Sequence, residues 1–173
     1  MRASSRRWLG SATFAAALAL SAGSTADRAL IAQPSQAAPS PDPILGTWKL
    51  DLAKSRYTPG PPPRSETRVH QAADGGVKVT ITRVEADGRR TSIEYTADYN
   101  SVESPVSGSS EIDTISLRRI NAYTAEATLM HAGKQIASVR RVVSRDGSSM
   151  TISIEGTDSR GPFTREAVYA RVY

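Results

Sequence analysis

The sequence predicts an all-β protein, a closed antiparallel up-and-down β-barrel of about ten strands. From Ile44 onward, short runs of alternating apolar and polar residues recur, as in strands that bury one face. Glycine, aspartate, asparagine and serine separate these runs at the short intervals typical of a barrel or sandwich. No segment keeps a 3.6-residue apolar period, and the nearest helical candidate, residues 52–57, would make one or two turns.

The run 91–99 shows the strand period most clearly, because Ile93, Tyr95, Ala97 and Tyr99 fall on one face and polar residues on the other. A proline-rich loop around residues 59–63 interrupts the pattern, since proline removes a backbone donor. The predicted strands span residues 45–51, 65–71, 77–85, 91–99, 102–106, 114–120, 124–131, 134–144, 150–156 and 163–172.

The connections between most of these strands are only a few residues long, so each strand should pair antiparallel with the one before it. A ten-strand meander would leave two exposed edges, and closure of the first strand on the last removes them. A barrel of this size encloses slightly more space than its side chains need, which predicts a ligand cavity. Tyr95, Tyr99, Leu129 and Tyr169 are large enough to fill it instead.

The amino terminus predicts export to the periplasm or the exterior. Residues 1–26 combine arginines at positions 2, 6 and 7 with an apolar run over 8–22, the pattern of a signal peptide. Cleavage after Gly23 or Ala26 and either Sec or twin-arginine export fit this segment. Residues 27–43 hold four prolines among alanine, serine and glutamine and predict a disordered linker. Residues 44–173 form the predicted barrel domain.

Charge and composition argue against nucleic-acid binding and exclude cysteine chemistry. The net charge of +5 arises largely before residue 40, where four arginines face one aspartate, and the remainder holds 18 basic and 16 acidic residues. Because a nucleic-acid-binding protein clusters its basic residues, this scatter argues against such a partner. The chain has no cysteine, which excludes disulfides, thiolate chemistry and lipid attachment at a cysteine.

The opening strand carries a family resemblance. Gly46-Thr47-Trp48-Lys49-Leu50 resembles the G-x-W start of lipocalins and the G-T-W-K-L start of intracellular fatty-acid-binding proteins. There the glycine permits close backbone approach and the indole plugs the closed end, which makes Gly46 and Trp48 structural residues. Arg171-Val172-Tyr173 resembles the R-x-Y of the last fatty-acid-binding strand, which holds a ligand carboxylate. The helix-turn-helix lid of that family is replaced here by the proline-rich loop.

Across its mature length the chain is similar to a group of exported bacterial proteins of lipocalin-like type. The resemblance rests on GTWKLDLAKSRYTPGPPP, YTADYNSVESPVSG, DTISLRRINAYTAEATL and VRRVVSRDGSSMTISIEGT, and covers residues 45–172. It implies the calycin-type barrel fold and export, and it implies no activity.

The predicted function is non-catalytic binding of a small hydrophobic or amphiphilic ligand, including an acidic, fatty-acid-like one. Arg171 and Tyr173 are the candidates for an acidic head group, since residues two apart share a strand face. Tyr95 and Tyr99 are the candidates for lining. Arg171 has two other readings, a cover over Trp48 or a solvent-exposed side chain. The alternative function is a filled barrel that serves as an interaction or structural module of the cell envelope.

Two arginine pairs, at residues 118–119 and 140–141, lie on predicted strands, so one member of each pair should face the interior. A buried arginine must be paired or must await an anion, because an unpaired buried charge costs several kcal/mol. An internal ion pair is the favoured expectation, with Glu94, Glu126 or Asp113 as the partner.

Catalytic and metal sites are not predicted. His70 and His131 have no acidic or histidine cluster at metal-ligand spacing around them, and no haem-ligand pattern is present. No G-x-S-x-G or serine with an adjacent base occurs, and the carboxylate pairs 94/98 and 111/113 fit a solvated strand face. No cofactor, no membrane span after signal cleavage and no particular oligomer are expected.

Overall fold

The computed structural model describes residues 42–173. The chain divides into two units, Met1–Ala38 and Pro39–Tyr173, and the described residues belong to the second. The predicted signal peptide, 1–26, lies outside the described residues, as does the predicted linker, 27–43, apart from its last two residues.

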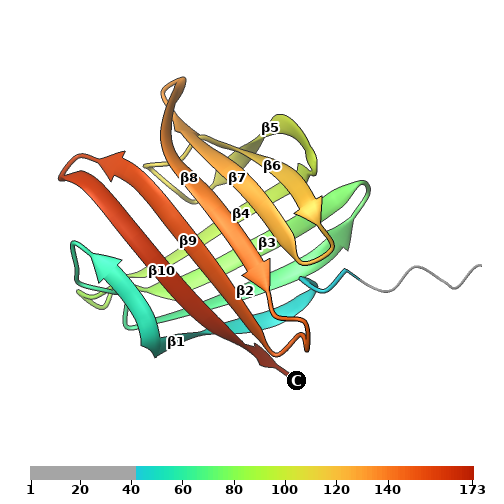
Figure 1. The fold of residues 1–173 in the computed structure, drawn as a ribbon. Helices are drawn as coiled ribbons and strands as arrows, with labels where there is room; N and C mark the ends of the chain where they lie inside the picture. Colours follow the sequence, from blue (N-terminus) through green and yellow to red (C-terminus); the bar gives the residue numbers. More distant parts are fainter. Residues whose placement is uncertain (1–41) are drawn as a thin grey trace, which may run out of the picture. The chain divides into compact units, whose positions relative to one another are not determined.

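Ten antiparallel strands form a closed barrel in which each strand pairs with its neighbours in sequence, and the first pairs with the last (Figure 1). This confirms the predicted all-β up-and-down barrel. The strand ends differ from the expected ones by at most two residues, except that β1 continues to Thr58 instead of ending at residue 51. The strands are β1 Gly46–Thr58, β2 Ser65–Ala73, β3 Gly76–Val84, β4 Arg90–Asp98, β5 Asn100–Ser107, β6 Thr114–Asn121, β7 Thr124–His131, β8 Lys134–Val143, β9 Ser149–Asp158 and β10 Gly161–Val172.

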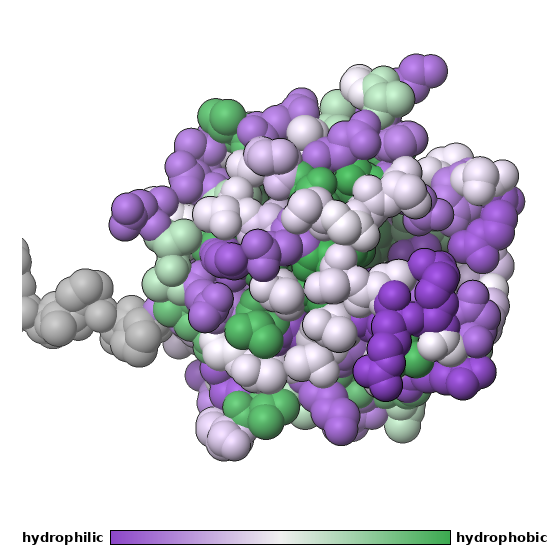
Figure 2. All heavy atoms as spheres, turned by 180° about the vertical axis from the view of Figure 1, so that it is seen from behind, coloured by the Kyte–Doolittle hydropathy of each residue, from purple (hydrophilic) through white to green (hydrophobic). Residues whose placement is uncertain are grey.

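The alternation of side chains decides which face of each strand is buried. In β3, Val77 and Val79 are fully buried and Ile81 nearly so, whereas the side chains between them are more exposed. The outer surface on the side opposite to that of Figure 1 is mainly hydrophilic or intermediate, with scattered hydrophobic residues (Figure 2). The apolar side chains therefore gather inside the barrel.

The interior contains two apolar clusters. One lies around Trp48 and joins the start of β1 to β8, β9 and β10, and the other joins β3, β4 and β6. The first consists of Ile44, Trp48, Leu50, Val143, Met150, Ile152, Ala167 and Tyr169, and the second of Val77, Val79, Ile81, Tyr95, Ala97, Ile115 and Leu117.

Residues 52–57, the nearest helical candidate of the sequence, form no helix and continue β1 through a bulge. The register with β10 shifts between Asp51 and Arg56. The Ser55 hydroxyl donates to the Asp51 carbonyl at 2.7 Å and accepts from the Val168 amide at 3.0 Å. Side-chain oxygens thus replace ladder bonds where the extra residues interrupt the pairing.

Residues 42–173 contain no apolar helix of membrane-spanning length.

Candidate functional site

One end of the barrel is closed by Trp48, which is fully buried. Its indole N–H donates to the Ile44 carbonyl at 2.7 Å, so the polar atom of the ring is satisfied. The guanidinium carbon of Arg171 lies 4.1 Å from the centre of the indole ring. A cation over an indole face is a favourable arrangement, and it makes Arg171 the cover of this plug.

Arg171 also ties three segments together at this closed end. It donates to the carbonyls of Pro43, Leu45 and Gly147. A side chain on Gly46 would place its Cβ 2.7 Å from Nη1 of Arg171, and Gly46 has φ = +123°. Glycine is therefore needed at this position both for the backbone conformation and for the space.

A buried ion cluster lies further along the interior, around Glu66. Its carboxylate is 1% exposed and accepts from Nε of Arg68 and Nε of Arg83, each at 2.6 Å. The Tyr169 hydroxyl donates to the same carboxylate at 2.6 Å. Burial alone would raise the pKa of Glu66, but the two guanidinium groups outweigh it and lower the pKa to about 2.

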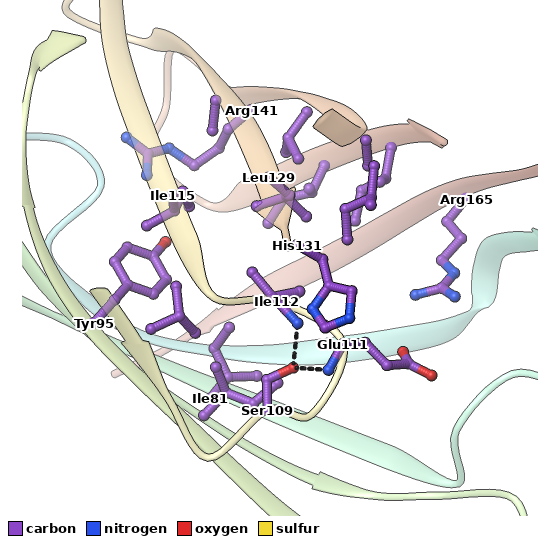
Figure 3. Close-up of a pocket in the computed structure, with 18 of the residues that line it drawn as sticks. Ile81, Tyr95, Ser109, Glu111, Ile112, Ile115, Leu129, His131, Arg141 and Arg165 are labelled. Carbon is purple, nitrogen blue, oxygen red and sulfur yellow. Dashed lines mark hydrogen bonds between the residues drawn. The ribbon is translucent and has the colours of Figure 1, made fainter. Parts of the chain in front are cut away.

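A cavity of about 430 Å³ adjoins this cluster, since Arg68 and Arg83 are among the residues that line it. Its volume falls within the range of small-molecule sites. The walls are mainly aliphatic and aromatic, and the β5–β6 connection, residues 109–112, lies at the mouth. Here Ser109 accepts from the amides of Glu111 and Ile112, which shapes the rim (Figure 3). The apolar lining includes Ile81, Ile93, Ile115, Leu117, Leu129, Val139, Ile152, Ile154 and Phe163.

Arg141 enters this cavity from β8 and is 9% exposed. Its Nη2 donates to the Tyr99 hydroxyl at 2.9 Å, so the side chain reaches from β8 to the end of β4. No carboxylate among residues 42–173 pairs with it. Tyr95 and Arg141 lie on one side of the cavity, and Glu111 and Arg165 on the other (Figure 3).

His70 lines the same cavity and is 2% exposed. Its Nδ1 is buried and has no hydrogen-bond partner in the described part of the chain. Burial, followed by the positive charges of Arg141, Arg68 and Arg171, lowers the pKa of His70 well below its ordinary value. The imidazole is therefore neutral at pH 7.

The buried part of the cavity wall carries more basic than acidic groups. Four arginines line it, Arg68, Arg83, Arg141 and Arg165, and the buried carboxylate within hydrogen-bond reach of two of them is Glu66. Burial and the nearby Arg83 lower the pKa of Arg165, as expected for a cation crowded by another. Of the acidic residues of the lining, Glu111 and Asp158 belong to the mouth, and Glu126 is paired with Arg118 and Arg140. The arrangement suits an anion at the inner end of an apolar chamber.

The four ligand residues predicted from the sequence occupy different places. Tyr95 lines the cavity. Tyr99 does not line it but accepts the hydrogen bond from Arg141, and its ring lies 3.8 Å from the guanidinium carbon of Arg119. Arg171 covers Trp48 at the closed end, and Tyr173 is 96% exposed beyond β10. The structure therefore brings neither Arg171 nor Tyr173 to the cavity. The guanidinium of Arg171 is held by backbone carbonyls at the closed end, and Tyr173 lies in solvent.

The expected internal ion pair was wrong in its partners. Glu94 pairs with Lys78 at 3.1 Å, Glu126 with Arg118 and Arg140, and Asp113 with His131, and all of these groups lie outside the interior cluster. Alternation along β7 turns Glu126 to the outer face. The internal carboxylate is Glu66 instead, and the inward member of the second arginine pair, Arg141, has none.

Sequence reasoning missed Glu66, Arg68, Arg83 and the cavity role of His70. A signal was present in the register, since Arg83 follows the apolar series of β3 at the same two-residue spacing and therefore faces inward. Arg68 opposes Ile81, and Glu66 opposes Arg83. Within residues 42–173, no group of three or more histidine, aspartate or glutamate side chains is placed to hold a metal ion.

No family model and no curated protein matches this chain. Among solved structures, it is similar to a de novo designed fluorescence-activating β-barrel, with 12% identity over 75% of this chain and 94% of that one, and a TM-score of 0.40. At that score the similarity supports no argument about function. What the residues themselves establish is a closed ten-strand antiparallel barrel with an internal chamber that could hold a ligand.

Proposed function

We propose that this protein binds, without catalysis, a small amphiphilic molecule that has an apolar body and an acidic head group. The observation that carries the proposal is Arg141, a buried arginine in an apolar chamber with no carboxylate partner in the described chain. Removing a guanidinium from water costs several kcal/mol unless an anion compensates it. The head group of the ligand supplies that anion.

The internal cavity, or chamber, would bind the apolar body of the ligand. Its walls are aliphatic and aromatic, and each buried methylene of a ligand contributes about 0.8 kcal/mol. Tyr99 holds one nitrogen of Arg141, which leaves Nε and Nη1 for the ligand. Tyr95 lines the chamber beside them and supplies both ring surface and a hydroxyl.

The lipocalin-like, exported character of the protein is part of this proposal. The covered indole of Trp48 and the glycine at position 46 support the resemblance to calycin-type barrels. The predicted signal peptide, 1–26, supports export of the barrel to the periplasm or the exterior, where hydrophobic or fatty-acid-like molecules would be available to it. Cell fractionation, followed by amino-terminal sequencing of the exported form, tests this location.

The chamber also bears on the alternative function. A filled barrel that serves as an envelope interaction or structural module would have its interior occupied by its own side chains. An interior volume of about 430 Å³ favours a ligand over that alternative.

The test compares two adjacent arginines. Calorimetric titration with decanoate at pH 7.5 should give a dissociation constant that rises at least about tenfold in Arg141→Gln, since hydrogen bonds to charged groups contribute about 1.5–3 kcal/mol. Arg140→Gln is the matched control, because Arg140 lies on the outer face and pairs with Glu126. Decanol should bind both variants equally. Equal decanoate affinities in the two variants, or no binding by the natural protein, would overturn the proposal.

A further inference from the structure

His70 stands out among the buried groups because nothing in the described chain explains its polar atom. It follows Arg68 by two residues on β2, so both side chains face the interior, and both line the chamber. Across the sheet, Val79 opposes both His70 and Tyr95, which puts the imidazole at the level of the lining tyrosine. The imidazole therefore lies in the chamber wall at the level of Tyr95, and its Nδ1 is buried without a partner in the described chain.

The charges around His70 are almost all positive. The charges that act on it come from three strands, with Arg68 on β2, Arg141 on β8 and Arg171 on β10. The other titratable groups of this region are three tyrosines, Tyr95 of β4, Tyr99 directly after β4, and Tyr169 of β10. Glu66 is fully engaged by two arginines and a tyrosine. In the free protein, a protonated imidazole here would face three cations without an anion of its own.

We propose, building on the function above, that His70 is the second contact to the ligand's anionic group and that it becomes protonated when the anion binds. The anion lies between the imidazole and Arg141 and offsets the repulsion that keeps the free imidazole neutral. Below the pKa of the imidazole in the complex, one proton enters from solvent for each anion bound, and the charged imidazole N–H donates to the anion. The protein thus captures acidic amphiphiles more tightly as the surroundings acidify.

The linkage has a definite sign. A group that is neutral in the free protein and protonated in the complex makes binding stronger as pH falls. If the anion restores an ordinary histidine pKa of about 6.5 in the complex, affinity is flat above that pH. Below it, affinity rises about tenfold for each pH unit until the free imidazole also takes up a proton.

The experiment uses the full chain and decanesulfonate, whose head group stays ionised throughout the range, so that the ligand itself does not titrate. Calorimetric titrations between pH 8 and pH 5 should show the tenfold rise per unit below about pH 6.5. In His70→Gln this slope should vanish. His131→Gln is the matched control, because His131 lies at the mouth beside Asp113, and it should keep the slope.

Nuclear magnetic resonance of the natural protein gives the same answer without a substitution in the interior. The two histidines of the chain are resolved by comparison with His131→Gln. The His70 ring resonance should stay unchanged through the pH range around 6.5 in the free protein, and should titrate near pH 6.5 when decanesulfonate is saturating. Binding with equal slopes in natural protein and His70→Gln, or a His70 resonance indifferent to the probe, overturns this inference alone. Failure of decanesulfonate to bind at any pH overturns the proposed function and this inference together.

Discussion

Arg171 and Arg141 both turn toward the interior of the barrel, and they differ in the groups that accept hydrogen bonds from the guanidinium. Arg171 donates to three backbone carbonyls and covers the Trp48 ring, so every side of its guanidinium is used. Arg141 donates to one tyrosine hydroxyl. The first arginine is therefore part of the structure, whereas the second has no carboxylate partner in residues 42–173 and belongs to the proposed ligand site. The difference shows that burial of a charged residue is by itself no sign of function, and that its hydrogen-bond partners decide.

Glu66 extends this comparison to carboxylates, and its removal should have the largest effect. Glu66→Gln leaves Arg68 buried without an anion and leaves Arg83 only its contact with Glu85, which should lower the free energy of unfolding by about 3–5 kcal/mol. Glu126→Gln is the matched control, since Glu126 also bridges two arginines but on the outer surface, and should cost less than about 1 kcal/mol. Urea unfolding measures both. Equal costs would show that the interior cluster does not depend on its charge balance.

Acid should remove the same interaction. The pKa of Glu66 is about 2 in the folded protein and 4.5 ordinarily, so its contribution is complete above pH 4.5 and is lost as pH falls toward 2. A depression of this size corresponds to about 3 kcal/mol. Unfolding curves taken at intervals between pH 5 and pH 2 should show this loss in natural protein. If Glu66→Gln loses as much stability over the same interval, other carboxylates are responsible.

Arg171→Met tests the structural role of the arginine whose hydrogen bonds are all made within the protein. It leaves the carbonyls of Pro43, Leu45 and Gly147 without their donor and uncovers the indole, so the unfolding free energy should fall by at least about 2 kcal/mol. Thermal and urea unfolding provide the measurement. Its affinity for decanoate, corrected for any unfolded fraction, should stay unchanged, because Arg171 lies outside the chamber. Lost affinity would return Arg171 to the ligand site predicted from the sequence.

Arg141→Met should change the free energy of unfolding in the opposite direction. Replacing an unpaired buried guanidinium by an apolar side chain of similar length should stabilise the ligand-free protein by about 1–2 kcal/mol. The same substitution should abolish selectivity for decanoate over decanol. If this one substitution makes the protein more stable but less selective, the natural protein keeps Arg141 for binding at a cost in stability. If Arg141→Met destabilises the protein as Arg171→Met does, the two arginines belong to one structural class.

The sequence predicts the scaffold better than the chamber, and β2 shows why. In β3 the apolar residues mark the inner face unambiguously, so strand, register and burial follow from the period. In β2 the polar residues Glu66, Arg68 and His70 face inward. Thr67 and Val69 occupy the other face. The polarity pattern alone would therefore predict that Thr67 and Val69 face the interior, which is the wrong face of this strand. Alternation shows that two faces exist, but pairing with β3 is needed to tell which one is inside.

Gly46→Ala is the smallest test, and it isolates the contact between the opening motif and Arg171. Gly46 and Gly161 have similar φ, +123° and +113°, yet an added Cβ meets Arg171 at 2.7 Å in the first and nothing within 4 Å in the second. Both substitutions carry a backbone cost of about 1–2 kcal/mol, and the Gly46 variant should cost about 1 kcal/mol more. In an Arg171→Met background that excess should disappear, since a double-mutant cycle isolates the pairwise contact. If the excess persists there, the glycine of the opening motif serves the backbone alone, and Arg171 covers Trp48 without depending on it.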